Sequence, residues 1–475
     1  MKNIALLTFF LVFGYSLIGQ AQGLMLKWKY NLPNHYFQGD VGLSSDGTAF
    51  FVARSNANFS IPVLYALQQT PRAVKWKAPV LSEWRGYPVI WNNSTVYVLD
   101  AYEGANWTEI HLFALNITNG TTKWHTKSGP FDNYNSDSYI SIGLDGTVFC
   151  TANSGNMGAV SAFNPITGKK KWVFEIEVGL AQGCDITPIA VADNGNIYFA
   201  NSNGIYALNG STGEKIWEYF TDSSVSESPA IGDGGKIYAT DGGYLIALDG
   251  ATGAEIWKPF GSIGFLGGCH QSTEPVIGLN DTVYVGCIYD GIRAFDGSTG
   301  LKKWEFRTDQ PIYASPTVGS DGTVYVVCGD GKLYALNGAN GTKKSEFRTG
   351  NIPSSPTIGS DGVLYTVAYT DIYAIYSNSS GLANTTWPKA HSNNQNSGLA
   401  NSVPYFLSTR RLNLNSIEIN VPLSTQKETV LEYTSNLTNW IEYQRLSPKG
   451  GVFSVNIQLN QDTKENVRLW RSRVE

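Results

Sequence analysis

The sequence predicts an all-β fold: an eight-bladed β-propeller of four-stranded antiparallel blades, with seven blades as the alternative. The first observation behind this fold class is a phrase that recurs along the chain. It runs from a small residue through Asp or Asn and Thr-Gly to a tryptophan, most cleanly in residues 247–257. Its marker alanines are spaced by 39 to 48 residues, at positions 66, 114, 162, 207, 247, 294, 335 and 374. Repeats of this length are typical of solenoids, propellers and arrays.

The second observation is the alternation of short strands and tight turns within each repeat. Residues 314–347 contain a short apolar run, a Ser-Asp-Gly turn, and then strands at 323–327, 332–336 and 343–347. Asp-Gly and Asn-Gly between runs of four to six residues are hairpin signals. Four strands per repeat, without helical periodicity, are typical of a propeller blade. Seven blades remain open because the first and last copies of the phrase are degenerate.

The phrase itself has a physical explanation. The Asp or Asn side chain can bond its own backbone two residues on, and the glycine can adopt positive φ, so together they form a tight turn. The tryptophan then offers about 150–250 Å² of surface for docking between neighbouring blades. Six tryptophans are assigned this structural role: Trp76, Trp124, Trp172, Trp217, Trp257 and Trp304. Ser345 stands where a seventh is expected, so we expect that blade junction to be under-packed.

The two ends of the repeat region predict how the ring closes. Residues 26–32 resemble a fourth strand, although no complete repeat precedes them. The last repeat, residues 354–376, has only three good strands. We therefore expect the segment around Trp28 to supply the missing outer strand, which would close the ring and hide its sheet edges.

The repeated phrase resembles the tryptophan-docking repeat of the pyrroloquinoline-quinone (PQQ)-type β-propellers, over roughly residues 26–390. This superfamily holds quinoprotein alcohol dehydrogenases, the outer-membrane assembly factor BamB and many uncharacterised secreted repeat proteins. The resemblance to the dehydrogenases implies PQQ, a disulfide between adjacent cysteines stacked on it, and calcium held by Glu, Asn and Asp. This chain has no Cys-Cys pair and no Cys-x-x-Cys-His haem motif, and the calcium set does not map onto it. We predict no catalytic, cofactor-binding or metal-ligating residues; a PQQ-dependent oxidoreductase with calcium is the alternative.

Residues 1–21 read as a signal peptide, because a Lys is followed by an apolar run and then by Gly19 and Ala21 before a cut near Gln22. The run is short for a membrane span, and no later segment qualifies. We expect an exported chain, periplasmic or extracellular, that does not span a membrane. No cysteine near the cut supports a BamB-like lipid anchor. A net charge of −5 gives no reason to expect nucleic acid as a partner.

Without a catalytic set, the predicted function is a binding or scaffold platform, expected to be monomeric, for a protein or glycan partner in the cell envelope. This inference rests on fold analogy. Aromatic residues, Arg and Asn gather in and beside three predicted loops, and such residues are favoured at interfaces. The candidate partner surface is Trp84, Arg85, Tyr87, Trp107 and Tyr134. Local packing of the loops is the alternative.

The cysteines and histidines form no recognisable site. Five cysteines leave at least one free thiol in an exported protein, and a Cys269–Cys287 disulfide stays open. The five histidines lack metal-ligand spacing. We expect His111 and His125 to be exposed on strands.

The C-terminal part changes in character after the repeats. We place the propeller at residues 22–390, a polar linker at 391–403, and a small β-sandwich-like module at 404–475. The module could attach or sort the protein at the cell surface, or could stabilise the ring. Both alternatives stay open.

Overall fold

The computed structural model describes residues 23–55, 62–69, 72–79, 87–101, 110–130, 138–154, 156–177, 186–222, 225, 227–241, 244–258, 273–287, 291–350, 354–368, 370–377, 379–393, 396–397 and the strands between residues 408 and 474. Contacts divide the chain into two compact units. The first comprises Met1–Ala383 with Trp387–Ala400, and the second comprises Asn384–Thr386 with Asn401–Glu475.

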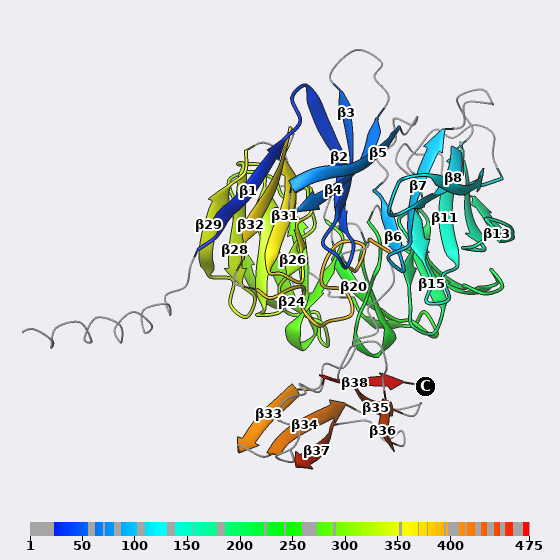
Figure 1. The fold of residues 1–475 in the computed structure, drawn as a ribbon. Helices are drawn as coiled ribbons and strands as arrows, with labels where there is room; N and C mark the ends of the chain where they lie inside the picture. The colour runs from blue at the N-terminus through cyan, green and yellow to red at the C-terminus, as the bar shows by residue number, and fades with distance from the viewer. Residues whose placement is uncertain are drawn as a thin grey trace, which may run out of the picture. The chain divides into compact units, whose positions relative to one another are not determined.

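The first unit is a ring of eight four-stranded sheets, which confirms the predicted eight-bladed propeller (Figure 1). Each blade is numbered in chain order and given from its inner to its outer strand. Blade 1 is β2 (His35–Leu43), β3 (Ala49–Ser55), β4 (Val63–Gln69) and β5 (Arg72–Pro79). Blade 2 is β6 (Val89–Trp91), β7 (Thr95–Ala101), β8 (Ile110–Asn116) and β9 (Thr122–Lys127). Blade 3 is β10 (Ile140–Ile142), β11 (Val148–Ser154), β12 (Met157–Phe163) and β13 (Lys170–Glu177). Blade 4 is β14 (Ala190–Val191), β15 (Asn196–Ala200), β16 (Gly204–Asn209) and β17 (Lys215–Phe220).

The second half of the ring repeats this plan. Blade 5 is β18 (Ala230–Ile231), β19 (Lys236–Asp241), β20 (Tyr244–Asp249) and β21 (Glu255–Trp257). Blade 6 is β22 (Val276–Gly278), β23 (Thr282–Cys287), β24 (Gly291–Asp296) and β25 (Lys302–Phe306). Blade 7 is β26 (Thr317–Val318), β27 (Thr323–Cys328), β28 (Lys332–Asn337) and β29 (Lys343–Arg348). Blade 8 is β30 (Thr357–Ile358), β31 (Val363–Ala368), β32 (Asp371–Tyr376) and, from the other end of the chain, β1 (Met25–Asn31). Short 3-10 turns lie at η1 (Asp233–Gly235) and η2 (Leu279–Asp281).

The repeated phrase forms the turn between the third and fourth strands of a blade. In blade 4, the Asn209 carboxamide accepts hydrogen bonds from the backbone amides of Ser211 and Thr212, at 2.9 and 3.1 Å. Gly213 follows with φ +78°. A Cβ at Gly213 would lie 2.6 Å from the ring of Trp172 in blade 3. The glycine is therefore required both for its backbone conformation and for the room it leaves.

The six tryptophans of the phrase lie between neighbouring blades. Each indole N–H donates to a backbone carbonyl in the corresponding turn of the next blade. The pairs are Trp76 to Ile117 (2.9 Å), Trp124 to Pro165 (3.1 Å), Trp172 to Gly210 (3.0 Å), Trp217 to Gly250 (2.9 Å), Trp257 to Gly297 (3.0 Å) and Trp304 to Gly338 (2.8 Å). Each contact combines a hydrogen bond with the burial of a large apolar surface, so it fixes the position of one blade on the next.

Strand β1 closes the ring by pairing antiparallel with β32, and Trp28 lies opposite Ala374. This is the register in which the other tryptophans face their marker alanines, as in Ala207 with Trp217. The expected under-packing at Ser345 is corrected. Leu24, just before β1, packs into the hydrophobic cluster at this junction. Its amide lies 3.4 Å from the Ser345 hydroxyl. The N-terminal segment therefore occupies space that a tryptophan fills at other junctions.

The second unit contains two three-stranded antiparallel sheets, with strand orders β33-β34-β37 and β36-β35-β38. The strands are β33 (Ser408–Asn413), β34 (Ser416–Pro422), β35 (Thr429–Thr434), β36 (Ile441–Leu446), β37 (Val452–Gln458) and β38 (Leu469–Val474).

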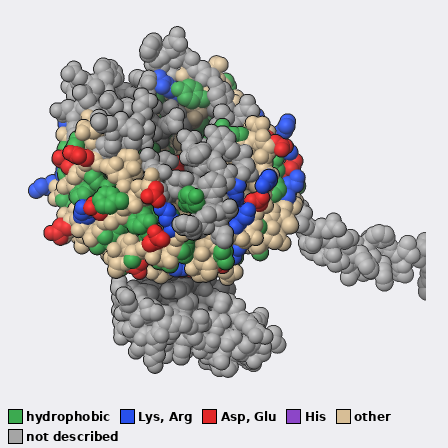
Figure 2. Space-filling view, turned by 180° about the vertical axis from the view of Figure 1, so that it is seen from behind, with side chains coloured by type: hydrophobic (Ala, Val, Ile, Leu, Met, Phe, Trp, Pro, Cys, Tyr) green, Lys and Arg blue, Asp and Glu red, His purple; other side chains and the backbone are tan. Residues whose placement is uncertain are grey.

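The described surface of the propeller is mixed in charge. On the face shown in Figure 2, acidic and basic side chains are interspersed and do not gather into a patch of one sign. Among the described residues, no helix is long and apolar enough to cross a membrane.

Candidate functional site

A part of the chain itself lies at the centre of the propeller, namely residues 387–393 and 396–397, which we call the plug (Figure 1). On one side, the carbonyls of Trp387 and Pro388 accept hydrogen bonds from Ile277 of β22 and Val318 of β26, at 2.7 and 2.8 Å. On the other side, the Ser397 carbonyl accepts one from Ile142 of β10, at 2.7 Å. The plug therefore joins the inner strands of blades 6 and 7 to that of blade 3.

The plug corrects the prediction of a linker that begins at residue 391. Ser392 and Asn396 are fully buried, and the contacts group residues up to 400 with the propeller. The inner strands of the blades are sheet edges, so their free amides need acceptors. The plug meets this need with backbone carbonyls, while polar side chains within it bond one another, as Asn393 does with Ser397 at 2.7 Å.

Lys389 belongs to the plug, and none of its surface is exposed to solvent. Its ammonium donates to the carbonyl of Ala390 at 2.7 Å and to the Asn396 side-chain oxygen at 2.9 Å. A longer contact of 3.4 Å reaches the carbonyl of Asn393. All three oxygens belong to the plug. A buried charge needs partners of this kind, because it has lost its water.

Two buried carboxyl groups from the blades face the plug. Glu274, which precedes β22, accepts hydrogen bonds from the Trp387 indole at 3.0 Å and from the backbone amide of His391 at 3.1 Å. Asp40 of β2 accepts one from the backbone amide of Ser355 at 2.9 Å. The His391 ring lies between them, with nitrogens 3.6 Å from Glu274 and 3.8 Å from Asp40.

Burial governs the titration of this cluster. It raises the pKa of Glu274 to about 8 and also raises the pKa of Asp40, while the charge of Lys389 opposes both shifts. Burial lowers the pKa of Lys389, although the nearby carboxyl groups of Asp40 and Glu274 act to raise it. Burial and the nearby Lys389 together lower the pKa of His391. Carboxyl and imidazole groups can exchange protons, but Glu274 is buried and His391 is half-buried, and the two side chains contact each other at the plug.

A calcium ion and a quinone do not fit this centre. Trp387 and Lys389 fill the space with side chains that are fully buried. The ammonium of Lys389 already places a positive charge beside Asp40 and Glu274, and it would repel a divalent cation. Among the described residues, no three His, Cys, Asp or Glu side chains are grouped to hold a metal ion.

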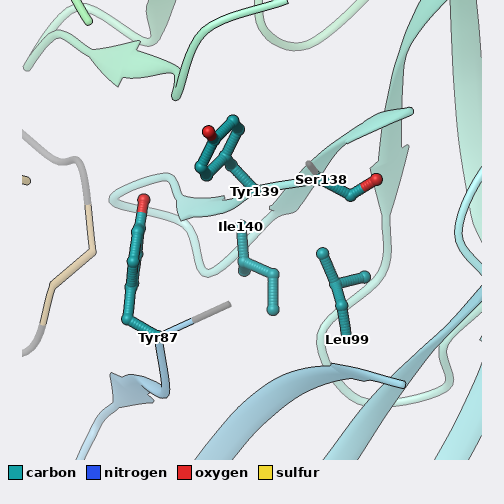
Figure 3. A pocket seen from close by; sticks show the side chains of 5 residues that line it. All are labelled: Tyr87, Leu99, Ser138, Tyr139 and Ile140. Atoms are coloured by element: carbon teal, nitrogen blue, oxygen red, sulfur yellow. The ribbon is translucent and has the colours of Figure 1, made fainter. Parts of the chain in front are cut away.

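A small pocket lies beside the plug, between blades 2 and 3 (Figure 3). Its lining residues are Tyr87, Leu99, Ser138, Tyr139 and Ile140. The rings of Tyr87 and Tyr139 lie next to each other, with their centroids 6.4 Å apart (Figure 3). The buried Ser138 hydroxyl has no hydrogen-bond partner among the described residues.

The structure places one of the five predicted partner-surface residues. Tyr87 is only 7% exposed and stacks on His391, with ring centroids 3.8 Å apart. Its assignment to an exposed surface is therefore corrected: the ring packs against the plug. The other four residues, Trp84, Arg85, Trp107 and Tyr134, lie outside the described part of the chain.

The cysteines and histidines add no site. Cys150 and Cys328 are free and buried. Cys287 is disulfide-bonded to a partner outside the described residues, so a pairing with Cys269 stays a prediction. His111 is buried, contrary to expectation, and its Nδ1 lies 3.2 Å from Nδ1 of His125. His125 on β9 is exposed, as expected.

The plug residues were missed from the sequence. Lys389 and His391 belong to no repeated phrase, and Asp40 and Glu274 each precede or enter an inner strand that shows no distinctive pattern. The one available signal was a single Lys and a single His within a stretch otherwise free of charge. That signal does not indicate burial.

The eight blades and the indole contacts define a propeller of PQQ-like repeats. The family model described as outer membrane protein assembly factor BamB matches residues 25–258, 156–305 and 270–383. The chain therefore belongs to this family of PQQ-like repeat propellers. Among curated proteins, no sequence matches it.

Solved structures with the same fold include BamB and dehydrogenases. BamB from Moraxella catarrhalis is 18% identical over 75% of this chain and 98% of its own, with a TM-score of 0.55. A europium-containing methanol dehydrogenase is 14% identical over 74% and 93%, with a TM-score of 0.57. A quinohaemoprotein alcohol dehydrogenase from Pseudomonas putida HK5 is 16% identical over 76% and 77%, with a TM-score of 0.57. At these identities the likeness is one of fold.

Proposed function

We propose that the protein is an exported, non-catalytic propeller that binds a protein partner in the cell envelope. The observation that carries this proposal is the plug, because a propeller whose channel is filled by its own chain has its outer surfaces left for recognition. The match to the outer membrane protein assembly factor family supports a partner of this kind. A glycan partner is the alternative, since it would use the same aromatic loops.

The long connections favour one face of the ring as the binding face. They join the second and third strands of blades 1 and 2, and they also join successive blades, as at residues 80–88, 128–139, 178–189 and 258–275. In an antiparallel four-stranded blade, all of these connections leave from the same end. On the opposite face, described connections between strands of one blade are tight turns such as residues 210–214, and residues 379–383 contact the turn at Ser320. Loops on a rigid scaffold are where binding residues concentrate.

The test compares variants on the two faces. W84A/W107A removes two aromatic side chains from the long-connection face. L144S/I166S is the matched control, because Leu144 and Ile166 are exposed on the turn face, by 56% and 77%. We expect cross-linking and affinity capture from the native envelope to lose one protein partner with W84A/W107A and to keep it with the control.

The readout requires both variants to have the melting temperature of the wild type. A folded W84A/W107A variant that captures the same proteins would contradict the assignment of this face. Loss of binding on a glycan array, with unchanged protein capture, would support the glycan alternative.

A further inference from the structure

The environment of the Lys389 side chain indicates a charged ammonium. Three oxygens lie within 3.4 Å of its nitrogen, from Ala390, Asn393 and Asn396. A neutral amine has only two N–H groups, so one of these oxygens would face its lone pair. An ammonium has three donors and can satisfy all three. The charge is held without an ion pair, since none within 4.0 Å is formed between Lys389 and the carboxylates of Asp40 or Glu274.

The three oxygens all come from the loop that Lys389 itself begins. Three residues of this loop have left-handed backbone conformations, with φ of +56° at His391, +67° at Ser392 and +56° at Asn396. Residues other than glycine adopt such conformations at a cost. The ammonium draws the carbonyls of the loop inward and so offsets that cost.

We propose that Lys389 is a tethered cation around which the plug folds, and that removing its side chain leaves a binding site for a small primary alkylammonium ion. Truncation to alanine removes three methylenes and the ammonium, which together correspond to n-propylammonium. The three carbonyl oxygens would take its three N–H donors. Asp40 and Glu274 would favour its positive charge, while the His391 ring beside them stays neutral. This inference is independent of the partner proposed above.

The experiment is chemical rescue of a K389A variant. We expect its melting temperature to fall by about 5–10 °C, because a buried cation with three partners is lost. Adding n-propylammonium chloride should restore much of that fall with a saturable dose response, because a ligand that binds only the native state stabilises it. Tetramethylammonium chloride at equal ionic strength has no N–H donors and should have no such effect. Wild type, and K343A at an exposed lysine, should not respond to n-propylammonium.

If K389A does not fold, a second variant, K389M, tests the proposal. K389M keeps most of the side-chain volume but removes the charge. We expect K389M to be less stable than wild type, because the oxygens of Ala390, Asn393 and Asn396 lose their donor. Equal stability of K389M and wild type would overturn the proposal. So would a folded K389A that is indifferent to n-propylammonium, or a proteolytic map of the wild type in which the peptides holding Lys389 and Asn396 are cross-linked with the loss of one ammonia, which would show that Lys389 has condensed with the Asn396 carboxamide.

Discussion

At the scale of single residues, the same polar chemistry serves opposite purposes in the turns and in the channel. On the surface, Asn209 and Asp249 build tight turns by accepting hydrogen bonds from amides two and three residues ahead. In the channel, Glu274 accepts its hydrogen bonds from residues more than 100 positions away along the chain. The first kind of contact is visible in a local pattern and the second is not.

Glu274 should make the stability of the propeller depend on pH. Its folded-state pKa of about 8 lies above the ordinary value of 4.5, so the folded protein holds a proton that the unfolded chain releases. The stabilisation is fully present below pH 4.5 and is lost as the pH rises through 8. E274Q cannot ionise. We expect wild type to lose on the order of 2 kcal/mol more than E274Q between pH 5.5 and 8.5, measured by urea unfolding.

The other charged groups of the cluster, Asp40, Lys389 and His391, are present in both proteins, so the difference isolates Glu274. The exposed Glu214→Gln serves as the control and should follow wild type at both pH values. Parallel pH profiles for wild type and E274Q would show that Glu274 does not titrate in this range.

At the scale of elements, the closing strand β1 is the contact on which the ring depends most. It covers the edge of β32 and brings Trp28 against Tyr365, with ring centroids 6.0 Å apart. It is also the only strand of its blade that comes from the other end of the chain. Every other blade is contiguous in sequence, so it can form without a long-range closure.

Deleting residues 24–31 should therefore destabilise the propeller. Without β1, the edge of β32 loses its partner and the cluster around Trp28 is exposed to water, so we expect the melting temperature to fall by about 10 °C or more. W28A keeps the backbone pairing and should show a smaller fall. Differential scanning calorimetry measures both variants; a deletion variant that melts with wild type would refute closure by this strand.

At the scale of the whole molecule, the fold of this chain is shared with BamB and with dehydrogenases. In this chain the centre of the ring holds Trp387 and Lys389, both fully buried. The same eight-bladed frame can thus support a catalytic centre or a filled one. The frame alone does not decide between these functions.

The quinoprotein alternative gives a test at this scale. Incubation with PQQ and calcium chloride should neither raise the melting temperature nor give dye-linked oxidation of primary alcohols. The plug side chains occupy the space that PQQ would need, and the positive charge of Lys389 would repel calcium. Magnesium chloride at equal ionic strength is the control for nonspecific salt effects. Saturable stabilisation by PQQ together with calcium would contradict a non-catalytic assignment.

The sequence by itself determined the blades, the six docking tryptophans and the closure by residues near Trp28, and it predicted eight blades with seven left open. These features arise from local turns and short hairpins repeated at a regular spacing, so each copy shows the same pattern. Only the tertiary structure decided that Tyr87 packs inward, that Leu24 packs at the junction beside Ser345, and that residues 387–393 and 396–397 lie at the centre of the ring. The physical reason is that these contacts join residues far apart in the sequence. Asn396 contacts Pro88 across 308 residues, so the burial of Asn396 depends on the assembled ring.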